Sequence, residues 1–520
     1  MVVARRLLAS LIVVALASPA IAQPGDEAPY VVPEFMTQLP PLPPNVDAKS
    51  VWRLDLAEAL QVAIHQNTNV VVERQQVRIQ DLGIEVAKGK FEPVVNAFVD
   101  HNSIDTPPTT TIVGTAGQVV NTTSQDWNVS ASQMLETGAQ AQVGFSNNRS
   151  NTGAADAIDP LLYSSNVTAS ILQPILRGFS TDLVVPRADV LRAKITSKRE
   201  RAQLAVTASN IVQLTENAYW DLVNALYTYD LYVHSQQRAQ DQLALTHRQI
   251  DAGLLPPSDL ITAETTLAQR QLQVVQAELT IEQTSDALRS AMNLPRDQWS
   301  RPILPTERPS FATQPGTAED ALAIAIKNRP ELAQFDLDVQ TAIINLRQAE
   351  NNKLPQLNLG LSGSLYGVDP TYNGALDGIG RHDATGYAVS LNFSWTPLMR
   401  ATSAAAEMSR SSERIAAANR QQAVQDTWAA VRDAVRNQSS TERQVLAAAK
   451  FRELATENLA VEQRKFAASS SSNFLVAQRQ EDLATAQLAE LQAVLSHKKA
   501  LVQLLRAEGT LLDARHVLLR

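Results

Sequence analysis

Glu58-Ala59-Leu60-Gln61-Val62-Ala63-Ile64 recurs in the sequence as Asp320-Ala321-Leu322-Ala323-Ile324-Ala325-Ile326, 262 positions later. At the same separation, Pro93 matches Pro355 and Asn96 matches Asn358. Further along, Gln173-Pro174-Ile175-Leu176 matches Thr396-Pro397-Leu398-Met399. Each copy contains, in order, an amphipathic helix, alternating strands and two very long helices. An internal duplication of coiled-coil helices and membrane-type strands favours a channel across a cell envelope over an enzyme.

The first 50 residues have the pattern of a secretory leader and a proline-rich extension. Arg5 and Arg6 precede the apolar stretch Leu7–Ala17, and Ala20-Ile21-Ala22 has the form of a cleavage site. We therefore expect a signal peptide over residues 1–22. Residues 23–50 contain Pro40-Pro41-Leu42-Pro43-Pro44, so we expect either a polyproline conformation or a disordered tail there.

Composition narrows the class of protein further. The chain has no cysteine, which excludes disulfides and a lipid-modified cysteine. The net charge of −8 provides no basic footprint for nucleic acid. No segment after the leader approaches about 18 uncharged apolar residues, so we expect any membrane-embedded part to consist of strands.

Hydrophobic periodicity divides the remaining chain into two repeats, residues 51–300 and 317–520, joined by a proline-rich linker at 301–316. In repeat 1 we expect strands within about 91–175, and in repeat 2 within about 354–397. Asp55 is expected to cap the first helix and Ser258 the return helix of the first hairpin. The predicted helices are 54–90, 186–251, 258–293, 318–353, 402–467 and about 473–505; the predicted strands are 94–101, 127–133, 139–146, 166–172, 356–366 and 387–395.

The matched prolines make the strand count uneven between the repeats. Pro93 and Pro174 lie 81 positions apart, whereas Pro355 and Pro397 lie 42 apart. The first repeat therefore has room for one more hairpin, which turns at Thr137-Gly138. If this hairpin belongs to a membrane barrel, one chain supplies six strands and three chains supply 18. If it forms an extracellular loop, one chain supplies four strands and three chains supply 12. The sequence leaves both alternatives open.

No motif for catalysis, cofactor binding or metal binding is present in the sequence. The seven histidines stand singly, without metal-ligand spacing. The sequence contains no G-x-S-x-G, no P-loop and no G-x-G-x-x-G. We therefore expect no enzyme activity, and no catalytic, cofactor or metal site.

Four motifs in this order resemble the TolC family of outer-membrane efflux and secretion channels. They are the opening Leu54-Asp55-Leu56-Ala57-Glu58-Ala59-Leu60, the stretch Gln173-Pro174-Ile175-Leu176-Arg177-Gly178-Phe179, and two hairpin tips. The tips are Ala252-Gly253-Leu254 with Ser258-Asp259-Leu260, and Lys465-Phe466 through Ser472-Asn473-Phe474. The resemblance covers nearly the whole chain after the leader.

The resemblance implies an α+β membrane protein: a homotrimer with an outer-membrane β-barrel continued by a long periplasmic coiled-coil barrel of helices. Such a protein is the passive exit duct of a tripartite efflux or type I secretion system in a Gram-negative cell, working with a periplasmic adaptor protein and an inner-membrane pump. The alternative from the residues alone is a barrel-anchored adhesive or structural surface protein. The implied adaptor contacts are Gly253, Leu254, Ser258, Ser469, Ser472 and Asn473, and the candidate pore constriction is Asp259, Leu475 and Gln478.

Overall fold

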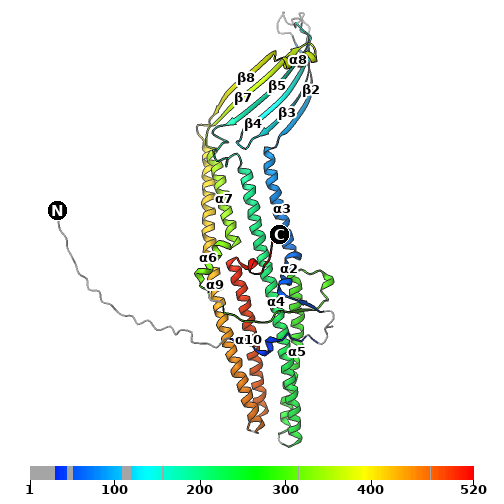
Figure 1. Cartoon of the computed structure of the whole chain (residues 1–520), viewed down its shortest axis with the longest axis vertical. Coiled ribbons are helices and arrows are strands. Elements are labelled where there is room, and N and C mark those ends of the chain that lie inside the picture. The colour runs from blue at the N-terminus through cyan, green and yellow to red at the C-terminus, as the bar shows by residue number, and fades with distance from the viewer. Residues whose placement is uncertain are drawn as a thin grey trace, which may run out of the picture.

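The structure, a computed structural model, describes residues 30–41, 43, 51–107, 119–154, 157–253, 255–313, 316–468 and 470–519. The molecule is elongated, with a β-sheet at one end and two helical hairpins reaching to the other (Figure 1). No helix in these described ranges is both long enough and apolar enough to cross a membrane. The expected signal peptide, residues 1–22, lies outside the described residues.

Each half begins with two helices where one was expected. In the first half α2 (Leu56–Gln66) and α3 (Thr68–Lys88) are separated by Asn67, whose side chain accepts a hydrogen bond from the Asn69 amide and caps α3. The prediction of one continuous helix over 54–90 is therefore wrong. Asp55 caps α2 by accepting from the Glu58 amide at 2.6 Å, as expected.

The second half repeats this arrangement at the same separation in the sequence. Helices α6 (Ala318–Asn328) and α7 (Pro330–Asn351) break at Arg329, so the single helix expected over 318–353 is also wrong. Thr317 caps α6 in the position that Asp55 has at α2. Thus the two halves start alike, with a polar cap and a short helix before a longer one.

Six antiparallel strands form one meandering sheet in the order β2-β3-β4-β5-β7-β8. In the part of the chain that the structure describes, the two outer strands, β2 and β8, each pair with one neighbour. All six predicted strands are present, and each is longer than predicted because pairing extends beyond its apolar part. Their bounds are β2 Val94–Thr106, β3 Val120–Met134, β4 Gln140–Thr152, β5 Leu161–Pro174, β7 Gln356–Asp369 and β8 Ala384–Ser394.

A ten-residue helix, α8 (Tyr372–Arg381), lies between β7 and β8, where the sequence predicted neither a helix nor a strand. Thr371 caps it, and its Ala375 and Gly378 are buried against β7. A Cβ atom on Gly367 would lie 1.9 Å from the Ala375 carbonyl oxygen, so the close approach of helix and strand requires glycine at this position.

Below the sheet, four long helices form two hairpins: α4 (Ala188–Asp251) with α5 (Ser258–Ala291), and α9 (Arg400–Ala467) with α10 (Asn473–Glu508). Helix α9 has 68 residues and α4 has 64, whereas the connection from the last strand is shorter before α9 (395–399) than before α4 (175–187). A short helix, α11 (Leu511–Ala514), follows the second hairpin.

The helices stand side by side in a row with two free ends. Near the sheet the order of contacts is α3-α4-α7-α9, and near the hairpin ends it is α5-α4-α10-α9. Helix α9 is therefore the last helix at one end of the row at both levels, and α3 and α5 are the last helices at the other end. The same chain also supplies the free strands β2 and β8.

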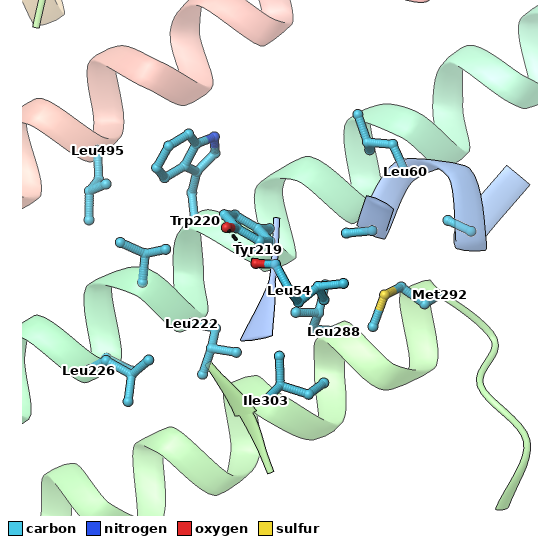
Figure 2. Packing of buried hydrophobic residues seen from close by; sticks show 14 of the residues in the cluster. Leu54, Leu60, Tyr219, Trp220, Leu222, Leu226, Leu288, Met292, Ile303 and Leu495 are labelled. Atoms are coloured by element: carbon cyan, nitrogen blue, oxygen red, sulfur yellow. Dashed lines mark hydrogen bonds between the residues drawn. The ribbon is translucent and has the colours of Figure 1, made fainter. Parts of the chain in front are cut away.

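The hydrophobic core sits at mid-height, where the two halves meet (Figure 2). Tyr219 of α4 donates a hydrogen bond to the Leu54 carbonyl at 3.1 Å, which ties α4 to a small parallel pair of strands, β1 (Trp52–Leu54) and β6 (Ile303–Pro305). Neither short strand was predicted, and β6 lies in the expected linker. Pairing of β1 with β6 therefore holds the segment before α2 and the linker between the repeats against the helical hairpins.

The segment before the first repeat also belongs to this core. Residues 30–41 carry a short helix, α1 (Glu34–Thr37), whose Met36 is fully buried. Tyr227 of α4 donates to the Gln38 carbonyl at 2.9 Å. This part of the extension is packed, whereas a polyproline or disordered segment was expected, because a buried methionine and a buried tyrosine hydroxyl hold it in place.

Candidate functional site at the hairpin ends

The two hairpin ends lie together at the end of the molecule opposite the sheet (Figure 1). In the first hairpin Gly253 has a φ of +73°, and its amide bonds to the Ile250 carbonyl at 2.8 Å. This is the left-handed conformation that commonly ends a helix. Apart from its own neighbours in the chain, no described residue has a heavy atom within 4 Å of the place where its Cβ would be, so backbone conformation favours glycine here. Leu254 lies outside the described residues.

The expected cap at Ser258 is wrong. Helix α5 begins at Ser258 itself, after Pro257, and no side chain caps it. Pro256 and Pro257 start the helix instead, since their carbonyl groups accept from the Asp259 and Leu260 amides at 3.1 and 3.2 Å. Asp259 stands in the first turn of α5, where a carboxylate is favoured by the helix dipole.

In the second hairpin a serine side chain caps the return helix, whereas the return helix of the first hairpin has no side-chain cap. Ser472 accepts a hydrogen bond from the Leu475 amide at 3.4 Å and so caps α10. Leu475 and Gln478 are exposed on α10. Ser469 lies outside the described residues. No described contact joins Asp259 to Leu475 or Gln478, so one protomer does not bring the three constriction candidates together.

Asn473 is a polar residue that joins the two hairpins near their ends. It is 3% exposed, accepts from the Gln242 side-chain amide at 2.7 Å and donates to the Thr246 hydroxyl at 3.0 Å. Gln242 and Thr246 both belong to α4. Because these contacts lie within one protomer, Asn473 fixes the start of α10 against α4, in addition to any role in partner contact.

A second tie between the hairpins was missed from the sequence. Arg270 of α5 forms an ion pair with Glu481 of α10, and Arg270 is itself 6% exposed. Its guanidinium also donates to Gln273 at 3.0 Å. The nearby Arg238 of α4 has a pKa below the ordinary arginine value, first because it is buried and second because Arg270 repels its charge. The signal in the sequence was an arginine placed between two glutamines, Gln269 and Gln271.

A groove of about 800 Å³ runs between α5 and α10 beside this ion pair. Threonine and glutamine side chains make up much of its lining, and Gln478 is one of them. Ile261, Leu272 and Phe474 also line it and are 67%, 58% and 63% exposed. The groove is therefore mainly uncharged, with three apolar side chains open to a partner.

Farther up, one buried acid faces a neighbouring histidine. Burial raises the pKa of Asp230, and His234, 3.5 Å away on the next turn of α4, acts in the opposite direction. In the described ranges no three acidic or histidine side chains lie close enough to hold a metal ion. At the hairpin ends themselves, Asn473 and Arg270 form the hydrogen bonds and the ion pair between helices.

Comparison with known proteins supports the resemblance seen in the sequence. Residues 321–510 match the family described as outer membrane efflux protein. No curated protein matches the chain. Among solved structures, the outer-membrane channel OprN is 14% identical, with a TM-score of 0.60 over 88% of this chain and 90% of that one.

Two further channels have the same fold. The Neisseria gonorrhoeae MtrE outer membrane channel, in its open state, is 15% identical, with a TM-score of 0.59 over 88% of this chain and 89% of its own. The Campylobacter jejuni CmeC outer membrane channel is 13% identical, with a TM-score of 0.58 over 88% of this chain and 86% of its own. The expected resemblance to TolC-type channels is thus confirmed: residues 321–510 match the outer membrane efflux protein family, and most of the chain has the fold of solved outer-membrane channels.

Proposed function

We propose that three copies of this chain form a passive exit duct across the outer membrane and periplasm of a Gram-negative cell. The observation that carries the proposal is that the sheet, the helices next to it and the helices near the hairpin ends all have their unpaired elements along the same two edges of the molecule. β2, α3 and α5 stand at one edge, and β8 and α9 stand at the other. An interface between unlike edges generates a closed ring when the rotation per copy closes.

The free edges have the side chains that such a ring would bury. On α3, Val72, Ile79, Leu82 and Val86 are exposed at spacings of 7, 3 and 4 residues. This is the heptad spacing of a coiled-coil seam, and the described part of the protomer leaves it open. On α9, Met408 and Ile415 are exposed one heptad apart, at 71% and 60%. We infer that α9 of one copy packs against α3 and α5 of the next.

The strand edges require the same closure. Unpaired strand edges are not tolerated inside a lipid bilayer, so β8 of one copy pairs with β2 of the next in the proposed barrel. The number three comes from the resemblance to TolC-type channels. Internal duplication of one ancestral unit accounts for the matching elements of the two halves.

The hairpin ends are proposed to meet a periplasmic adaptor protein, which links the duct to an inner-membrane pump. Gly253, Leu254, Ser258, Ser469 and Ser472 are the end residues proposed for this contact, and the groove of about 800 Å³ beside Gln478 is open to a partner. We propose that Asp259, Leu475 and Gln478 narrow the duct where three copies meet. Because the chain acts as a conduit in this proposal, the pump supplies the energy.

Cross-linking of detergent-purified protein tests the assembly, and conductance in a planar bilayer tests the activity. We expect a cross-linked trimer that conducts ions. A monodisperse monomer that conducts ions would contradict the trimeric duct. A stable trimer with no conductance under any applied voltage would favour the barrel-anchored adhesive protein instead.

A further inference from the structure

The extra hairpin of the first half, β3 with β4, lies inside the sheet and not beside it. β3 pairs with β2 along 13 residue pairs, and β4 pairs with β5 along 12. Without this hairpin, β2 and β5 would be neighbours, as β7 and β8 are in the second half. The hairpin therefore widens the sheet from four strands to six.

The short turn of this hairpin lies against the start of the long helices. Thr137 donates to the Gln173 side chain at 3.1 Å, and Glu136 lies 3.7 Å from Arg187 at the beginning of α4. Gly138 has a φ of +86°, and a Cβ there would lie 2.8 Å from the Gly178 carbonyl oxygen. The turn is thus fixed at the end of the sheet next to the helices. A hairpin that formed an extracellular loop would not reach this end.

The apolar face of the sheet continues through the extra hairpin. One row across all six strands contains Ala97, Val129, Phe145, Val167, Leu365 and Thr385. The adjacent row contains Asn96, Ser130, Gly144, Thr168, Ser364 and Gly386. Successive residues of a strand point to opposite faces, so one face is mainly apolar and the other is polar or small.

The apolar side chains of the extra hairpin are open to an external partner. Val129 is 46% and Val143 is 55% exposed, comparable with Leu361 of β7 at 43%. On β2 and β8 the same face carries Val99 and Val389, 84% and 70% exposed. A continuous apolar band opposite a polar face is the pattern of a strand wall between lipid and an aqueous lumen.

We propose that the β3–β4 hairpin is part of the membrane wall, that its apolar face contacts lipid acyl chains, and that three copies close a pore of 18 strands. This proposal rests on the proposed function. Strands about 4.8 Å apart and tilted by about 40° give a backbone diameter of roughly 36 Å for 18 strands and roughly 24 Å for 12.

The wider wall fits the helices below it. Three copies of the four-helix row make a ring of 12 helices, which at 8–10 Å between axes has a diameter of roughly 31–38 Å. An 18-stranded wall continues this ring at nearly constant width. Solute size is then limited at the hairpin ends and not at the outer membrane.

Single cysteines test the placement, since the chain has none of its own. Val129→Cys and Ser130→Cys probe β3, and Leu361→Cys and Ser362→Cys probe β7 as the reference pair. The trimer is reconstituted in phosphatidylcholine vesicles and labelled with a water-soluble maleimide. We expect the cysteines at 130 and 362 to react at least about tenfold faster than those at 129 and 361, because only the polar face meets water.

The reference pair separates the two possible failures. If 361 and 362 alternate but 129 and 130 react equally fast, the hairpin lies outside the wall, and the 18-stranded pore is wrong while the duct stands. If neither pair alternates, the sheet is not a membrane wall, and the proposed function fails with this inference.

Deleting residues 120–159 tests the width independently. The deletion removes β3 and β4 and leaves β2 free to pair with β5, with Val95 and Ala169 still on one face. Neutral polymers of about 20 Å diameter should enter the wild-type pore from the extracellular side and be excluded from the deletion variant. Equal exclusion by both trimers would overturn the wider pore. If the variant does not assemble, the cysteine pairs decide alone.

Discussion

Replacing Asn473 by alanine is expected to release the start of α10 from α4. The Asn473 side chain is held on both sides, by Gln242 at 2.7 Å and by Thr246 at 3.0 Å, and it is almost fully buried. Alanine removes both hydrogen bonds without changing the helical backbone, because alanine is the best helix former. The substitution therefore tests the tie between the hairpins and leaves each hairpin intact.

The expected cost follows from the two lost bonds. Each is worth about 1 kcal/mol net, so the closed arrangement loses about 2 kcal/mol relative to a locally opened one. The Thr246 hydroxyl keeps its bond to the Gln242 carbonyl at 2.9 Å, so it is not left without a partner. A change of about 2 kcal/mol corresponds to a roughly 30-fold larger open population.

Hydrogen exchange of the amides in the first turns of α10 measures that population. We expect these amides to exchange roughly 30-fold faster in Asn473→Ala, with amides of the mid-height core unchanged. Asn437→Ala is the matched control, since Asn437 makes an exposed bond to Gln503 at 3.0 Å. Its effect should stay below about fivefold. If exchange in Asn473→Ala stays within about threefold of wild type, the tie is not what holds the two ends together.

Three further substitutions have expected outcomes. Gly253→Val should leave the trimer and its amount in the membrane unchanged but abolish export, measured by dye accumulation, because a β-branched residue at a φ of +73° is strained. The control Gly253→Asn should keep export, since asparagine tolerates this conformation. Normal export by the valine variant would show that the tip assignment is wrong. Asp259→Ala removes three carboxylates from the proposed aperture, so resting conductance or cation selectivity in a planar bilayer should change; if both stay the same, the constriction lies nearer Gln478. Asp230→Asn should raise thermal stability at pH 7.5. Because the pKa of Asp230 is raised in the folded protein, the wild type loses stability as pH rises above the ordinary carboxyl pKa, and the loss is complete above the raised pKa. An equal gain in stability at pH 3 and pH 7.5 would contradict this origin.

The sequence predicted the order of elements because its signals are local. Hydrophobic periodicity identified α4 (Ala188–Asp251), and the break at Gly253–Pro257 separated it from α5, although the expected cap at Ser258 was wrong. The alternation of β8 is visible in Tyr387, Val389, Leu391 and Phe393. Such patterns need no knowledge of neighbouring elements, so these bounds agree with the structure to within a few residues.

The missed features depend on contacts between distant segments. Helix α8 forms in a glycine-rich stretch of poor helix propensity because Ala375 and Gly378 pack closely on Gly367. The break at Asn67 falls within an otherwise helical pattern, where a single asparagine is a weak stop signal. The pairing of Arg270 with Glu481 requires the relative register of two coils, which the spacing within each helix does not determine.

The uneven distribution of large side chains along the first hairpin has a mechanical consequence. In this hairpin the large buried side chains, such as Tyr219 and Leu226, lie at mid-height, whereas the buried positions nearer its end include Ala239, Thr246 and Ala263. Leu226 lies 25 residues from the end of α4 at Asp251, about 38 Å along the helix axis. If the mid-height core stays fixed, a tilt of the hairpin end by about 10° moves its tip by roughly 7 Å. A small rotation caused by a bound partner would thus displace the tip by about the length of a side chain.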